Sequence, residues 1–233
     1  MRWSRADLHM HTTCSDGRHT PERLAARLAA SPLSVAAVTD HDTVEGALRV
    51  EAALAGAGPE IVIGSEVSSA DGHVLALFIC ADVPAGLSAR ATIEAIHDQG
   101  GIAIAAHPYS LALGVGDLAG RLLFDAIELF NGAPLMDLAN ARARARLGGA
   151  RPAKVGGSDA HVASAAGRVH TVFPGEGAAG LRAAILTRQT RPAVDWPGHL
   201  AMLPAHLAWL AWLTVSRGLS LRPQRSSPTG TPT

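Results

Sequence analysis

The segment Asp7-Leu8-His9-Met10-His11 leads directly into Thr12-Thr13-Cys14-Ser15-Asp16-Gly17. Side chains alternate faces along a strand, so His9 and His11, two residues apart in an extended run, project the same way. Asp16 and Gly17 are typical of a turn, which can fold a carboxylate back toward the two imidazoles. Two surface or core histidines would give the same local pattern, so this pair alone does not establish a metal site.

Composition excludes several classes of protein. The 233 residues carry 20 basic and 20 acidic side chains, so no global basic field favours nucleic acid and no acidic field favours a cationic partner. Cys14 and Cys80 are too few for a secreted disulfide framework, and no signal pattern opens the chain, which predicts a reducing cytoplasmic location. Cys14 could act as a thiolate ligand, but a small filler residue is the simpler interpretation.

Short β-type runs alternate with helical runs, which predicts an α/β fold of parallel strands joined by crossover helices. Several runs are continuously apolar, as strands covered on both faces should be. We expect strands at residues 6–9, 35–39, 61–63, 74–79, 102–105, 126–129, 153–155 and 169–173. Helices are expected at 21–30 with Thr20 as N-cap and Pro21 in the first turn, 44–57 after Thr43, 88–99, 135–147 and 180–188.

One domain spanning residues 1–198 is expected, followed by an apolar helix within 199–216 and a disordered tail at 217–233. The helix at 203–216 is apolar nearly all round but too short to span a membrane. The favoured interpretation packs it on the outside of the barrel, with Trp209 or Trp212 against neighbouring helices. The alternative is that it makes a homodimer or touches a membrane surface.

Groups that can bind metal stand beside most of the predicted strands. The carboxyl ends of parallel strands share one face of a barrel, so groups placed there converge without being close in sequence. Imidazole and carboxylate donors suit Zn, Mn or Fe better than Ca or Mg. A single histidine after a strand is usually a hydrogen-bonded loop residue, but burying nine such groups together without metal would carry a heavy cost. The nine candidate ligands are His9, His11, Asp16, His41, Glu66, His73, His107, Asp159 and His161.

The motifs DLHMHTTCSDG, VTDHD, GSE, GHVLAL, AHP, IELFN and GSDAH stand in one order from Asp7 onward. In this respect the chain resembles the PHP (polymerase and histidinol phosphatase) family of metal-dependent phosphoesterases, up to about Arg191. The resemblance implies a distorted (β/α)7 barrel of PHP type and up to three metals. It implies one metal held by His9, His11, Glu66 and Asp159, a second shared through Glu66 with His73 and His107, and a third held by Asp16, His41 and His161.

The chain departs from the longer nucleoside bisphosphate phosphatases of that family. Those carry an inserted helical domain before the AHP motif, whereas only 33 residues separate His73 from His107 here. The chain therefore resembles a short form without the lid domain, and a nucleotide substrate is in doubt.

Residues near the predicted ligands are candidates for substrate binding and proton transfer. Arg18 and Arg168 could clamp phosphate, because guanidinium groups match phosphate oxygens, although solvated arginines are as common. His170 and Asp42 could protonate a leaving group. Asp7 could orient the imidazole of His9 or His11, although a surface residue at the strand edge is an equal alternative. Asn131 could touch substrate or close a turn.

These features predict a metal-dependent phosphoesterase that hydrolyses a phosphate mono- or diester by attack of a metal-bound hydroxide. Two to three divalent ions (Mn, Fe or Zn) are expected, and three would give a locally positive pocket for an anionic substrate. The expected partner is a small phosphorylated substrate or a short oligonucleotide, without a stable nucleic-acid complex. The alternatives are a metal hydrolase of amides or lactones and a non-catalytic metal-binding module. A non-catalytic module should have lost some ligands, and none of the nine is missing.

Overall fold

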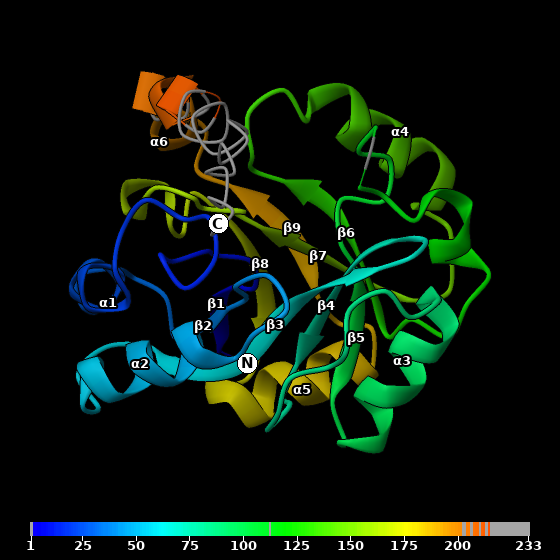
Figure 1. The fold of residues 1–233 in the computed structure, drawn as a ribbon, viewed down its shortest axis with the longest axis horizontal. Coiled ribbons are helices and arrows are strands. Elements are labelled where there is room, and N and C mark those ends of the chain that lie inside the picture. The colour runs from blue at the N-terminus through cyan, green and yellow to red at the C-terminus, as the bar shows by residue number, and fades with distance from the viewer. Residues whose placement is uncertain are drawn as a thin grey trace, which may run out of the picture.

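A curled β-sheet forms the centre of the molecule in the computed structural model (Figure 1). The structure describes residues 2–111, 113–201, 204, 205, 207–209, 211, 212 and 214. Among these residues the sheet has the strand order β7-β6-β5-β4-β3-β2-β1-β8-β9. The strands are β1 (Trp3–Asp7), β2 (Val35–Val38), β3 (Glu60–Ser69), β4 (Gly72–Leu77), β5 (Ile102–Ala105), β6 (Ala126–Asn131), β7 (Ala153–Gly157), β8 (Val169–Pro174) and β9 (Arg191–Val194).

The two ends of this strand order meet, so the sheet is a nearly closed barrel. β7 contacts both β8 and β9. The Thr171 hydroxyl donates to the Gly156 carbonyl oxygen at 2.9 Å, and the Gly156 amide donates to the same hydroxyl at 3.0 Å. The predicted α/β barrel is confirmed. The described residues form nine strands, and the count of seven is not confirmed.

Strand direction differs from the prediction in one respect. The pairs β1–β2, β2–β3, β5–β6 and β6–β7 are parallel. The pairs β1–β8, β3–β4, β4–β5 and β8–β9 are antiparallel, so the expectation of parallel strands throughout is wrong. The turn at Ala70 and Asp71 joins β3 to β4 directly, too short a connection for the crossover that parallel neighbours need.

Helices cover the outside of the barrel (Figure 1). They are α1 (Pro21–Ala29), α2 (Glu45–Leu54), α3 (Ala89–Asp98), α4 (Asp137–Leu147), α5 (Gly177–Leu186) and α6 (Trp196–Ala201), with short 3₁₀ turns at Gly116–Gly120 and Ala163–Ala165. The Thr20 hydroxyl accepts from the Arg23 amide and Pro21 opens α1, as predicted. Thr43 is not the cap of α2, because Val44 occupies that position. The strand β9 was not predicted, and α6 begins three residues before the helical segment expected at 199–216.

Buried side chains alternate between two faces of the central strands. All four residues of β2 are buried: Val35 and Ala37 belong to one apolar cluster, and Ala36 and Val38 to another. Strands buried on both faces are continuously apolar, which explains the sequence pattern.

The segment after α6 is helical at the residues that are described between 204 and 214. Trp209 is only 6% exposed and packs in the cluster that contains Met10 and Leu24 of α1, whereas Trp212 is 47% exposed. The tail predicted at 217–233 lies outside the described residues. In the part of the chain that is described, no helix has the length and apolar character needed to cross a membrane.

Candidate metal centre

All nine predicted ligands lie at one end of the barrel. His9 and His11 follow β1, His41 follows β2, His107 follows β5, and Asp159 and His161 follow β7. His73 stands at the beginning of its strand, which would place it at the opposite end of an all-parallel barrel. Because β4 runs antiparallel to β3, with His73 opposite Ser68, its beginning lies at the same end as the other ligands.

Glu66 lies between two sets of histidines. Its Oε2 is 3.1 Å from His9 Nε2 and 3.2 Å from His11 Nε2. Its Oε1 is 2.8 Å from His73 Nδ1 and 2.9 Å from His107 Nε2. The two oxygens of one carboxylate therefore face two different histidine pairs. We call His9, His11, Glu66 and Asp159 the first ligand group, and Glu66, His73 and His107 the second.

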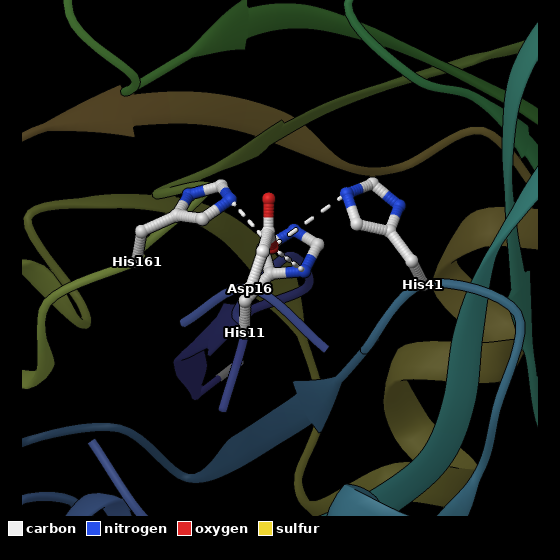
Figure 2. Close-up of side chains that lie close together, drawn as sticks. All are labelled: His11, Asp16, His41 and His161. Atoms are coloured by element: carbon white, nitrogen blue, oxygen red, sulfur yellow. Dashed lines mark ion pairs between the residues drawn. The ribbon is translucent and has the colours of Figure 1, made fainter. Parts of the chain in front are cut away.

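A third ligand group surrounds Asp16 (Figure 2). Asp16 Oδ1 is 3.1 Å from His161 Nε2, 3.7 Å from His41 Nε2 and 3.8 Å from His11 Nδ1. These four residues have ligand atoms within 4.8 Å of one another. His11 therefore contributes to both the first and the third group: its Nδ1 faces Asp16, and its Nε2 is 3.3 Å from Asp159 Oδ1.

The donor set fits divalent metal ions. Metal–ligand bonds of about 2.0–2.2 Å separate neighbouring ligand atoms by about 3.0–3.6 Å, which matches most of the spacings in the three groups. His9 Nε2, both ring nitrogens of His11 and Asp159 Oδ1 are buried without a hydrogen-bond partner among the described residues. Buried polar atoms are normally satisfied, so the convergence of these atoms fits a bound cation.

Electrostatics point the same way. Burial opposes charge on His11, yet Asp159 and Glu66 raise its pKa to about 10. Burial also opposes charge on Glu66, but the charge of His9 and a hydrogen bond from His107 hold its pKa well below the ordinary value. Burial opposes ionisation of Asp16 as well, and its interactions with His161, His11 and His41 lower its pKa to about 2. The carboxylates thus create a negative potential that favours cations, and metal binding would displace protons from the imidazoles.

The backbone is strained at two ligand positions. His107 has φ +24° and Asp159 has φ +49°, in a region that residues other than glycine seldom adopt. Such strain persists only where the surrounding structure enforces it, and it concentrates at functional sites.

Buried carboxylates that are not ligands hold the cluster in place. Glu128 Oε1 is 3.2 Å from His9 Nδ1, and Oε2 accepts hydrogen bonds from the His107 amide at 2.8 Å and from Asn131 Nδ2 at 3.0 Å. Asp40 Oδ1 accepts from the Thr12 amide at 2.7 Å and from the Ser15 hydroxyl at 2.6 Å, which fixes the loop before Asp16. Sequence reasoning missed both roles, although Glu128 lies within IELFN and Asp40 within VTDHD.

Asp7 acts differently from expectation, whereas Asn131 closes a turn as expected, because its Oδ1 accepts a hydrogen bond from the Ala133 amide at 2.9 Å. Burial raises the pKa of Asp7 to about 6, and its carboxylate accepts from the backbone amides of Ser158 and Gly167 at 2.9 and 2.7 Å. Within the described part of the chain it makes no hydrogen bond to an imidazole of the site, so the orienting role expected for Asp7 is wrong. Asn131 Nδ2 donates to Asp159 Oδ2 at 3.0 Å and thereby orients a ligand.

A cavity of about 380 Å³ opens onto the cluster. Metal-ligating side chains line one part of it, and Ser68, Ser110, Leu113, Ala133, Pro134, Met136 and Trp209 line the rest. The lining therefore combines polar and charged groups with apolar side chains, as in many small-molecule sites.

The four predicted catalytic residues do not line this cavity. The Arg168 guanidinium pairs with Asp195 at 2.6 Å, and His170 lines a separate cavity beside Arg5. Asp42 Oδ1 accepts from the Ser68 amide at 2.7 Å, and Arg18 is exposed. Their roles in catalysis remain predictions from the sequence.

Two known protein families match this chain. The PHP domain family matches residues 7–117, and the PHP-associated family matches residues 137–190. An uncharacterized protein of Methanocaldococcus jannaschii is 37% identical in an alignment of 139 residues that covers 54% of this chain and 81% of that protein. A 5′-3′ exoribonuclease of Haemophilus influenzae is 41% identical over 63 residues, 27% of this chain and 23% of the exoribonuclease.

Solved structures resemble the whole barrel. A two-domain protein from Bacteroides vulgatus that contains a predicted PHP-like metal-dependent phosphoesterase superposes with a TM-score of 0.65 at 18% identity. The superposition covers 83% of this chain and 65% of the other. At this level of identity the likeness concerns the fold.

Proposed function

Because this chain belongs to the PHP family, we propose that its nine-residue cluster binds two to three divalent transition-metal ions and hydrolyses phosphate esters. The observation that carries the proposal is Glu66, whose two oxygens face separate histidine pairs at 2.8–3.2 Å. A carboxylate in that position can bridge two ions. Bound divalent ions lower the pKa of water and neutralise charge on a phosphoryl group.

The chain's own residues hold this arrangement rigid. Glu128 orients His9, Asn131 orients Asp159, and Asp40 fixes the loop that carries Asp16. Ligands that are already fixed need little reorganisation when substrate binds. Such preorganised groups stabilise the transition state. The mixed nitrogen and oxygen donors suit Mn, Fe or Zn.

A small phosphorylated molecule or the end of an oligonucleotide fits the site. The cavity volume of about 380 Å³ lies near the lower end of the range for small-ligand sites. The similarity to an exoribonuclease covers only 27% of this chain, so it supports testing diesters beside monoesters.

The test combines metal analysis with hydrolysis. Purified full-length protein, expressed with added Mn, should carry two to three ions by elemental analysis and hydrolyse p-nitrophenyl phosphate or its bis-ester. Chelation should abolish hydrolysis, and added Mn should restore it. Glu66→Gln should lose metal from two groups together, whereas Glu51→Gln, at an exposed position on α2, should behave as the wild type. Hydrolysis that persists without metal, or a fully metallated protein inactive on all phosphoesters, would overturn the proposal.

A further inference from the structure

Trp209, from the helical segment after α6, reaches the metal cluster. Its side chain is 6% exposed and lines the same cavity as His41, Glu66 and His73. A residue near the end of the described chain thus forms part of the wall of a site whose predicted ligands all lie before residue 162.

Two contacts of Trp209 converge on the third ligand group. Its indole Nε1 donates a hydrogen bond to the Asp16 backbone oxygen at 3.2 Å. Its ring lies against the His161 imidazole, with ring centroids 4.1 Å apart and planes inclined by 38°. Asp16 and His161 are themselves paired, with 3.1 Å between Oδ1 and Nε2.

These two ligands need support because both lie in loops. Asp16 lies in the turn after β1, and His161 lies between β7 and a short 3₁₀ turn. His161 Nδ1 is 3.1 Å from the Asp159 backbone oxygen, so with a proton on Nδ1 the ring can donate there and leave Nε2, on the side of Asp16, to bind a metal ion. The indole against the imidazole restricts rotation of that ring, and the indole N–H fixes the backbone that carries the carboxylate.

We propose that Trp209 is a positioning residue that holds Asp16 and His161 in the geometry required to bind the third metal ion. This rests on the proposed function, since it assumes that the third ligand group binds metal. The segment after α6 is accordingly part of the metal centre. Groups that orient metal ligands without touching the ion commonly change metal affinity by about 10–100-fold.

The test measures metal binding directly. Mn²⁺ binding to the full chain is followed by equilibrium dialysis for the wild type and for Trp209→Ala, Trp209→Phe and Trp212→Ala. Trp209→Ala should weaken one ion by about 10–100-fold and leave the others unchanged. Trp209→Phe keeps an aromatic face but loses the N–H donor, so its loss should be smaller. Trp212→Ala removes a 47% exposed tryptophan from the same segment and should bind all ions normally.

A spectroscopic readout adds a second criterion. Co²⁺ titration should quench tryptophan emission as the third group fills, and that component should disappear in Trp209→Phe but persist in Trp212→Phe. The proposal is overturned if Trp209→Ala lowers only the melting temperature while every ion binds with wild-type affinity, or if the wild type never binds a third ion. A protein that binds three ions but hydrolyses no phosphoester would refute the proposed function and leave the role of Trp209 intact.

Discussion

Replacing Glu128 by glutamine tests how the first ligand group is held. The side chain is 1% exposed, and one oxygen faces His9 Nδ1 at 3.2 Å. The other oxygen accepts from the His107 amide at 2.8 Å and from Asn131 Nδ2 at 3.0 Å. A glutamine of nearly the same shape has only one oxygen, so it cannot serve both sides.

Two orientations are open to the new amide. If its oxygen keeps the His107 and Asn131 bonds, its NH₂ group faces His9 Nδ1. That nitrogen must then accept, and the proton moves to Nε2, which faces Glu66 at 3.1 Å and cannot bind metal while protonated. If the amide is reversed, two buried donors lose their acceptor, at about 1–3 kcal/mol each.

The first orientation should prevail, because its cost is smaller. Loss of an orienting partner weakens metal binding by about 10–100-fold. This loss of affinity corresponds to about 1.4–2.7 kcal/mol of metal-binding free energy, whereas leaving two buried donors without an acceptor would cost about 2–6 kcal/mol. Glu128→Gln should therefore fold normally yet bind its most affected ion about 10–100-fold more weakly.

The assay is a competition titration of Mn²⁺ against a chelator at fixed pH, with the melting temperature of the metal-free protein as a fold control. Glu51→Gln serves as the matched charge control, because Glu51 is exposed on α2. A Glu128→Gln protein with wild-type metal affinity would refute the tautomer argument. A large fall in the metal-free melting temperature would show that the reversed orientation prevails.

Two further predictions concern the loop after His11. In Gly17→Ala, the added Cβ would lie 2.5 Å from the His11 backbone oxygen, so the loop must move. We expect denaturant unfolding to show a free energy of unfolding lower by about 1–3 kcal/mol, and elemental analysis to show loss of the third ion. Full retention of both stability and the third ion would contradict the geometry. Cys14→Ala should keep activity within about twofold, because Cys14 lies outside the cavity lining and its Sγ is 3.9 Å from Arg49 Nη1. A dead Cys14→Ala protein with its metals still bound would argue for a thiol nucleophile.

The sequence predicted that the ligands converge, because the ends of strands and the types of side chain that follow them can be inferred from short stretches of sequence. Short β-type runs, several of them continuously apolar, located eight of the strands, and His9 and Glu66 could be proposed as ligands before any geometry was known. The antiparallel direction of β4 could not be assigned in this way, because a run of apolar residues carries no information on strand direction. His73 was therefore placed correctly by a rule that does not apply to its strand.

Roles that depend on distant contacts were missed or misassigned. Glu128 meets His9 across 119 residues, and Arg168 pairs with Asp195 instead of facing the cavity. Trp209 was expected to be buried against neighbouring helices, but its indole also meets a predicted ligand. Such partners are set by how the barrel closes, which no local pattern encodes.

The closure of the barrel also has a consequence for synthesis of the chain. The Ser4 hydroxyl donates to the Gly175 carbonyl oxygen, 171 residues away, and β1 pairs with β8 along its length. The Ser158 hydroxyl likewise donates to the His9 carbonyl oxygen across 149 residues. β1 therefore cannot complete its pairing until β8 has been synthesised, and pairings of such high sequence separation form slowly. Until β8 has been made, the barrel cannot close around His9 and His11, so we expect metal to bind after closure.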